Sequence, residues 1–427
     1  MHDEPAGLTH GAADHAAYIA HLSLQLGRLL LQNGSDSAHV HDAVLRFVAV
    51  FGDEAELLVT YEGLLLTVAD HGQFRTKLGH AVQTTGVGLA VIGRIDRLVE
   101  DAERGGVDLA RAAVELDAIE SQPGPYSRWM VAAALGLTAA SLARLFGGDW
   151  AAVCSVFVAG IAGTALRLEL GRRHTNPVLI PFTTALVSGA IGALAVRLSG
   201  SATPALGLVA PGMILVPGVP LINAVKEMIG GHVSVGVSRL GFAGLVIAAI
   251  GLGLFLATAV TGVAIPVDAP TRILGVPEDA LFSALAAGGY AFLFGVPLRL
   301  AWACVLCGIG SHTLRTLWMQ FGLGIASGTL IGAVVAGVLA CVFARAVKAP
   351  PVAFAFPGVV AMIPGAFAFR GWIGTLQIMH LGAAAPAPLI AETFSLGVDC
   401  VLMVAAIAIG IAVAISVLES PRRQISE

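Results

Sequence analysis

From residue 198 to residue 225 the chain carries no charged side chain, which is long enough for an α-helix to cross a bilayer. The same stretch contains Pro211, Pro217 and Pro220. Proline removes a backbone donor and clashes with the preceding helical turn, and lipid cannot satisfy the carbonyl that is freed. The stretch therefore predicts a membrane segment whose helix breaks where protein or a water-filled cavity surrounds it.

The composition extends this interpretation to most of the chain. Of 427 residues, 56% are hydrophobic and 12% are charged, and the mean hydropathy is +0.84. Soluble globular proteins carry about 25% charged residues. The 52 glycines are typical of membrane helices that pack closely. We predict a polytopic α-helical membrane protein.

The charge distribution indicates a separate N-terminal domain. Residues 1–128 contain 18 acidic and 9 basic residues, whereas the rest of the chain has a net charge of +5. We predict a small cytoplasmic α/β (α+β) domain over 1–125, with Ser35 or Asp36 and then Asp108 capping helices and a hairpin turning near residues 62–63. The sequence has no stripe of basic residues, so nothing in it indicates nucleic-acid binding. The first 20 residues are acidic and lack the apolar core of a secretory signal.

The membrane part is predicted to contain ten spans, in two five-helix repeats over 126–265 and 266–427. The predicted spans are 129–147, 150–168, 177–197, 204–225, 239–262, 279–298, 299–314, 319–344, 350–369 and 397–418.

The distribution of basic residues predicts the orientation. With the N-terminal domain in the cytoplasm, ten basic residues beyond Arg128 lie on the inner side and five on the outer side, as the positive-inside rule requires. Both termini are then cytoplasmic. The inner residues are Arg167, Arg172, Arg173, Lys226, Arg239, Arg299, Arg345, Lys348, Arg422 and Arg423, and the outer ones are Arg144, Arg197, Arg272, Arg315 and Arg370.

The proline-rich stretch occurs twice. The sequence APGMILVPG at 210–218 is matched by FPGVVAMIPG at 356–365, and each lies in the fourth span of its block of five. Because five is odd, the second block must enter the membrane from the opposite side, which predicts inverted repeats with broken fourth helices and a substrate site between them. We expect 211–218 and 357–365 to be non-helical and to bind substrate through Pro211, Gly212, Pro217, Gly218, Pro357, Gly358, Pro364 and Gly365.

Four segments together resemble the threonine/serine exporter family. They are LGRLLLQNGSDSAHVHDAV (26–44), RAAVELDAIE (111–120), PGMILVPGVPLINAVKEMIGGHVSVGVSRL (211–240) and PPVAFAFPGVVAMIPGAFAFRGW (350–372). The resemblance implies ten spans and export of small amino acids driven by the proton-motive force, with two halves fused that are separate subunits in some bacteria. Some split relatives are linked to dicarboxylates, which leaves succinate as an alternative substrate. Glu227 stands where we expect Asp in relatives.

Asn223 and Arg370 are candidate substrate ligands at matching positions. Each lies six residues after the second proline of its repeat. Asn223 suits a substrate amine or hydroxyl, and an interhelical hydrogen bond is the alternative. Arg370 suits a carboxylate, and a side chain extended toward the membrane surface is the alternative.

Glu227, His232 and Asp399 are the candidate proton carriers, because carboxylates at partial depth and histidines change protonation near neutral pH. The alternative for Glu227 and His232 is a loop face that contacts the N-terminal domain. Asp399 is expected to begin the last span.

Two other classes of protein remain as alternatives, an intramembrane enzyme and a membrane scaffold without transport activity. The sequence motifs HExxH, GxSxG and Walker A are absent. A scaffold function would not explain why two helices are broken at matching positions. We expect no catalytic residue, no metal and no cofactor, and as partners a small-molecule substrate, the lipid bilayer and no nucleic acid, with a homo-oligomer left open.

Overall fold

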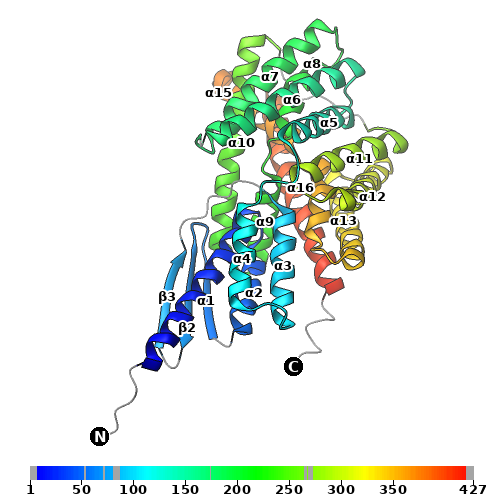
Figure 1. Ribbon diagram of the computed structural model, residues 1–427. Coiled ribbons are helices and arrows are strands. Elements are labelled where there is room, and N and C mark those ends of the chain that lie inside the picture. The colour runs from blue at the N-terminus through cyan, green and yellow to red at the C-terminus, as the bar shows by residue number, and fades with distance from the viewer. Residues whose placement is uncertain are drawn as a thin grey trace. The chain divides into compact units, whose positions relative to one another are not determined.

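The computed structural model describes residues 7–51, 54–70, 73–79, 87–173, 175–263, 267 and 273–419. The chain is mostly helical, with one three-stranded sheet (Figure 1). It divides into two compact units. Met1–Gly124 and Lys226–Arg239 form the N-terminal unit, and Pro125–Val225 and Leu240–Glu427 form the membrane unit. The inclusion of Lys226–Arg239 in the N-terminal unit agrees with the alternative stated for Glu227 and His232, a loop face that contacts the N-terminal domain.

The N-terminal unit contains the predicted helices and hairpin. Its strands pair antiparallel in the order β1-β2-β3, and Leu57 lies opposite Leu66. Strand alternation directs Leu57, Leu66 and Val68 into a core that also contains Phe47 of α2. The elements are α1 Gly7–Gln32, α2 Ser37–Val50, β1 Glu54–Val59, β2 Leu64–Asp70, β3 Gln73–Gly79, α3 Leu89–Glu103 and α4 Leu109–Ser121.

Two predicted helix caps are confirmed. The Asp36 side chain accepts a hydrogen bond from the His39 N–H and begins α2, and the Asp108 side chain accepts one from the Arg111 N–H and begins α4. Local sequence therefore determines where these helices start.

Among the described residues of the membrane unit, every regular element is a helix. Its elements are α5 Arg128–Leu145, α6 Trp150–Arg172, α7 Leu179–Leu198, α8 Pro204–Met213, α9 Gly218–Ile229, α10 Val233–Thr261, α11 Val276–Leu293, η1 Leu298–Leu300, α12 Ala301–Gln320, α13 Ile325–Val347, α14 Val352–Val359, η2 Val360–Met362, α15 Gly365–Leu381, η3 Gly382–Ala384 and α16 Ala387–Glu419. The last residues of α9 and the first of α10 belong to the N-terminal unit.

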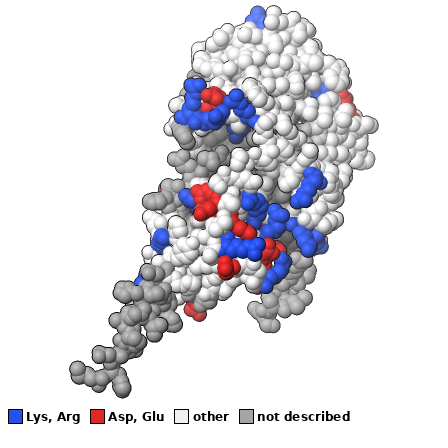
Figure 2. Space-filling view, viewed as in Figure 1, with Lys and Arg blue, Asp and Glu red and all other residues white. Residues whose placement is uncertain are grey.

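By length and hydropathy, five described helices can each cross a membrane: α6, α7, α10, α13 and α16. Two bent helix pairs bring that number to seven. The other three predicted spans coincide with α5, α11 and α12, which fall short of the same test and carry ionisable residues such as Asp279 and Arg315. Figure 2 shows broad surfaces of the membrane unit without a charged side chain. Of the residues in the orientation count, Arg272, Arg422 and Arg423 lie outside the described residues.

Helices α5 and α11 are equivalent in the two halves of the membrane unit. Each has 18 residues and is followed by a phenylalanine, Phe146 or Phe294. The next residue in each case is a glycine with positive φ, 87° at Gly147 and 66° at Gly295. The second set lies 148 residues after the first.

The same spacing of 148 relates further positions. Gly200 after α7 and Lys348 after α13 both have positive φ, 66° and 52°. A β-carbon added to Gly160 on α6 would lie 3.0 Å from the Ala139 β-carbon, and one added to Gly308 on α12 would lie 2.5 Å from the equivalent atom of Ala287. Local backbone geometry and helix packing therefore match at these positions, which lie 148 residues apart.

Candidate functional site

The first broken helix consists of α8 and α9, which are bent by 56° relative to each other. Residues 214–217 separate them. The Gly218 N–H donates to the Val216 carbonyl at 2.8 Å, and the Pro217 carbonyl accepts from the Leu221 N–H at 3.1 Å. The first helical segment ends at Met213, and the second starts directly after Pro217.

The second broken helix has the same local structure. Helices α14 and α15 are separated by η2 and residues 363–364, and are bent by 46°. The Gly365 N–H donates to the Ile363 carbonyl at 2.8 Å, and the Pro364 carbonyl accepts from the Ala368 N–H at 2.9 Å. The predicted pair of breaks is therefore present.

The breaks are shorter than predicted. Pro211 and Gly212 lie inside α8, and Pro357 and Gly358 lie inside α14. Our expectation that both full Pro-Gly segments would be non-helical was wrong at these four residues. Proline at these positions frees one carbonyl without ending the helix.

Helix α12 compensates for Pro357, one of the two prolines that remain helical. Pro357 leaves the Ala353 carbonyl without its usual donor, and the Cys304 thiol donates to that carbonyl at 3.5 Å. The Gly358 carbonyl accepts from the Ser311 hydroxyl at 2.8 Å. Backbone polar groups in a bilayer must be satisfied inside the protein, and α12 supplies two of the donors.

The two breaks contact each other reciprocally. A β-carbon added to Gly218 would lie 2.2 Å from Ile363 Cδ1, and one added to Gly365 would lie 3.0 Å from Val216 Cγ2. In each contact, the glycine that begins one half-helix meets the side chain two residues before the equivalent glycine of the other. This is the contact pattern expected of a pseudo-two-fold axis that passes between the breaks.

Polar side chains approach both breaks. At the first break, the Tyr290 hydroxyl donates to the Ile214 carbonyl at 3.5 Å. The Arg167 guanidinium is close enough to interact electrostatically with the phenolic oxygen of Tyr290. At the second, the Cys400 thiol lies 3.9 Å from the Pro364 carbonyl, with Asp399 beside it in the chain. The sequence placed Arg167 at the inner end of the second predicted span, and no signal in its own segment connects it with α11.

Asn223, Arg370 and Asp399 are all in the membrane unit. Asn223 is buried on α9. Arg370 on α15 donates to the Val267 carbonyl and lies 3.8 Å from Glu392. Asp399 lies inside α16, which starts at Ala387, and its place at the beginning of the last span stays a prediction. Roles for these three residues in substrate binding or proton transfer stay predictions.

Glu227 lies in a different environment, inside the N-terminal unit. Its carboxylate accepts hydrogen bonds from the Ser37 N–H at 3.1 Å and hydroxyl at 2.8 Å. Its other oxygen lies 3.1 Å from Arg239 Nε, an ion pair in which the N–H is not directed at the carboxylate. Arg239 also donates to the Ser35 carbonyl at 3.2 Å. Glu227 therefore joins 226–239 to the start of α2.

A second ion pair supports the same connection. Lys226 Nζ lies 2.6 Å from the Asp36 carboxylate. Burial alone would raise the pKa of Asp36, but Lys226 and the His39 N–H lower it to about 2. His232, in the α9–α10 turn, is half-buried, and its N–H donates to the Glu227 carbonyl at 2.8 Å. Proton coupling by Glu227 or His232 stays a prediction.

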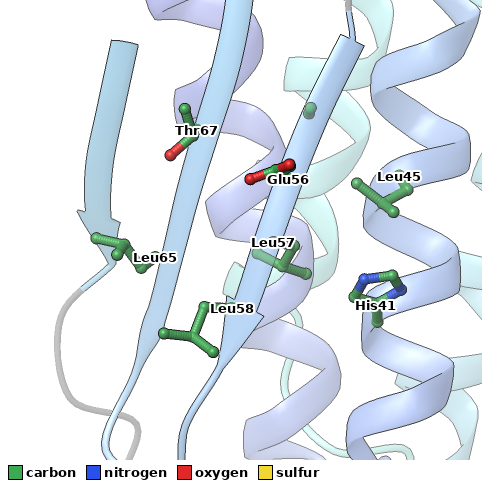
Figure 3. Close-up of a pocket in the computed structure, with 8 residues that line it drawn as sticks. His41, Leu45, Glu56, Leu57, Leu58, Leu65 and Thr67 are labelled. Carbon is green, nitrogen blue, oxygen red and sulfur yellow. The ribbon is translucent and has the colours of Figure 1, made fainter. Parts of the chain in front are cut away.

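A shallow pocket of about 450 Å³ lies on the N-terminal unit, between the sheet and α2 (Figure 3). His41 and Leu45 of α2 line one side, and residues of β1 and β2 line the other. The remaining lining residues are Ala55, Glu56, Leu57, Leu58, Leu65 and Thr67. The pocket contains none of the predicted site residues.

One buried ionic cluster was not identified from the sequence. Asp279 on α11 and His312 on α12 are in direct contact inside the membrane unit. The only sequence signal was the weakness of 299–314 as a span, because His312 lowers its hydropathy.

Paired broken helices inside a bundle of membrane-crossing helices define a polytopic membrane transporter. Residues 21–261 match the family described as "Putative threonine/serine exporter", and residues 279–417 match "Threonine/Serine exporter, ThrE". The chain belongs to the threonine/serine exporter family and carries both domains of the family in one chain. The resemblance noted in the sequence is confirmed.

Individual relatives divide between two substrate names. "Probable succinate transporter subunit YjjP" of Escherichia coli (strain K12) is 31% identical over 246 residues, which are 57% of this chain and 95% of that protein. The protein of the same name from Klebsiella aerogenes is 30% identical over 57% of this chain and 94% of its own length. "Probable threonine/serine exporter" of Mycobacterium tuberculosis is 27% identical over 77% of this chain and 62% of that protein. No solved structure matches the chain.

Proposed function

We propose that this protein is a secondary active exporter of small polar amino acids, threonine or serine, coupled to the movement of protons. The observation that carries the proposal is the reciprocal contact of the two breaks at Gly218 and Gly365. In transporters built from repeats, substrate sites form where such interrupted helices meet.

The half-helices that follow the breaks suit a carboxylate. The first-turn N–H groups of α9 and α15 have no acceptor within their own helix, and the dipole makes each N-terminus attractive to an anion. Pro220 removes one donor from α9. The α15 end therefore offers more donors and is the better candidate for the substrate carboxylate.

A zwitterionic substrate needs partners for both of its charges, because an unpaired charge in an apolar interior costs several kcal/mol. We propose that the four Pro-Gly pairs shape the site, with Asn223 and Arg370 at its two mouths. Asp399, next to the cysteine that contacts Pro364, can balance the substrate ammonium.

Export of a small dicarboxylate such as succinate is the second candidate. It is favoured by the Escherichia coli relative of that name and by Arg167, whose guanidinium lies near the Tyr290 hydroxyl that reaches the first break. A dicarboxylate would use this cation in addition to the N-terminus of α15. A small amino acid remains our first choice because the two family matches are both described by threonine/serine export, and together they cover both halves of the chain.

We further propose ten spans arranged as inverted repeats in the bacterial inner membrane, with both termini in the cytoplasm. Each predicted span coincides with a helix or a bent helix pair. Basic residues predominate on the side assigned to the cytoplasm.

Counterflow in proteoliposomes tests the function. Purified protein is reconstituted with a high internal concentration of one unlabelled compound, and uptake of the labelled compound is followed for a panel of amino acids and dicarboxylates. We expect exchange of threonine or serine and its loss in Gly218→Leu, which must displace Ile363. Gly244→Ala, at a position with open space around it, is the control. Exchange of succinate alone would select the second candidate, and no exchange with any compound would contradict transport.

A further inference from the structure

Asp279, on the first turn of α11, is the centre of a buried polar cluster in the membrane unit. His312 Nδ1 lies 3.0 and 2.8 Å from its two carboxylate oxygens. The Thr316 hydroxyl donates to the same carboxylate at 2.7 Å. Arg315 interacts with it electrostatically. All four side chains are buried, Asp279 being 2% exposed and His312 8%.

The repeat indicates that the fold does not need Asp279 and His312. With the spacing of 148 residues, Asp279 corresponds to Val131, His312 to Thr164 and Thr316 to Leu168, whereas Arg315 corresponds to another arginine, Arg167. The first half packs α5 against α6 without a carboxylate or a histidine at these positions. Buried ionisable groups in a membrane are costly, so a pair that packing does not require indicates a function.

The surroundings of the cluster leave few other charged groups. Among the described residues, α5 contributes Arg144, which is paired with the neighbouring Glu278, and α12 contributes Arg315. Helix α14 and η2, which also pack against α11, have no ionisable residue. Arg315 Nε is buried without a hydrogen-bond partner in the described part of the chain. The positive charge of Arg315 balances Asp279, which leaves His312 to change the total charge.

The cluster is also connected to the second broken helix. Ser311, the residue before His312, donates to the Gly358 carbonyl of α14 at 2.8 Å. A change in the charge of His312 therefore acts on a helix that holds α14 in place.

We infer that Asp279 and His312 form the proton-coupling site of this exporter. One proton binds to the imidazole, where the carboxylate stabilises the cation, and it leaves when the pair becomes accessible to the other side. In the proposed orientation the first turn of α11 is near the outer face, from which protons enter during export. The inference rests on the proposed function and adds residues to it.

The test separates coupling from transport in reconstituted full-length protein. Two activities are measured, accumulation of substrate driven by a pH gradient and exchange of substrate for substrate at equal pH. Asp279→Asn and His312→Gln should lose gradient-driven accumulation and keep exchange. Glu278→Gln, one residue away and paired with the half-buried Arg144, is the matched control and should keep both.

A second measurement follows protons directly. A pH-sensitive dye inside the vesicles should report proton movement when substrate is added to the wild-type protein and none with Asp279→Asn. Gradient-driven accumulation at wild-type level in both Asp279→Asn and His312→Gln would overturn the inference. Loss of exchange as well, in protein that elutes as a single species, would also overturn it by assigning the cluster to substrate binding or packing. Failure of the wild-type protein to exchange any compound would instead contradict the proposed function.

Discussion

Glu227 is buried and has partners for both of its carboxylate oxygens. Ser37 donates two hydrogen bonds to one oxygen, and Arg239 lies 3.1 Å from the other. A carboxylate at this depth was predicted to carry protons, and the sequence could not show that Arg239, twelve residues away across a turn, pairs with it. The observed contacts favour a structural role, in which Glu227 fixes 226–239 to the N-terminal unit.

Glu227→Gln is expected to destabilise the protein. It leaves the buried Arg239 charge without a counter-charge, which costs roughly 2 kcal/mol or more. The double variant Glu227→Gln with Arg239→Gln should recover part of the melting temperature in detergent, because no buried charge then remains. Gradient-driven export that returns in the double variant would assign Glu227 to structure. Export that stays absent while stability returns would support our original prediction of proton coupling.

His39 is expected to make stability depend on pH. Burial would lower its pKa, but the hydrogen bond and charge of Asp96, 2.8 Å away, raise the pKa above 6.5. A raised pKa stabilises the fold fully below pH 6.5, and the contribution is lost as the pH rises through the higher folded value. The melting temperature of His39→Gln should therefore fall below that of the wild type mainly at low pH.

Asp36→Asn is expected to affect stability with a different pH dependence from His39→Gln. The pKa of Asp36 is lowered to about 2, so its stabilisation is complete above its ordinary value of 3.8 and is lost only as the pH falls toward 2. Between pH 5 and 9 its effect on the melting temperature should vary less than that of His39→Gln, because in this range the charge of Asp36 acts only through its weaker interaction with His39. A constant effect of His39→Gln over the same range would contradict the assigned pair with Asp96.

At the scale of the elements, the sequence predicted where the helices are interrupted but not the length of each interruption. The second proline of each repeat, Pro217 or Pro364, separates two helical segments as expected. Pro211 and Pro357 do not, and for Pro357 the reason is a thiol on α12 that donates to the freed carbonyl. Such a partner comes from a helix far away in the chain, and local sequence cannot reveal it.

The reciprocal contact predicts a graded effect of two substitutions. Gly218→Ala would place its β-carbon 2.2 Å from Ile363 Cδ1, whereas Gly365→Ala would approach Val216 only to 3.0 Å. The Ile363 terminal methyl can rotate away, so we expect a cost near the low end of overpacking, about 1 kcal/mol, and still a greater loss of stability and counterflow in Gly218→Ala than in Gly365→Ala. Adding Ile363→Ala should restore both, because it removes the clashing atom. Equal losses in the two alanine variants, without rescue, would contradict this contact.

At the scale of the whole molecule, the repeated Pro-Gly pattern predicted a duplicated membrane unit. The equal lengths of α5 and α11 and the matching packing of Gly160 and Gly308 support that prediction independently of the prolines. Some relations had no local signal, because they depend on contacts between distant helices. The Asp279–His312 pair is one of these relations. Contact of 226–239 with the N-terminal domain, by contrast, was one of the alternatives that the sequence offered for Glu227 and His232.

The relative direction of the two halves is a prediction that labelling can test. Gly200 and Lys348 are equivalent positions with positive φ, at the turns after α7 and α13. If five spans form each half, these turns lie on opposite faces of the membrane, with the first outside and the second inside. Two variants of a cysteine-free protein would carry one cysteine each, at Ser201 or at Lys348. A membrane-impermeant maleimide should label Ser201→Cys in intact cells and Lys348→Cys only after the membrane is opened. Labelling of both positions from the same side would mean that the halves are parallel, since inversion requires equivalent turns to face opposite solutions.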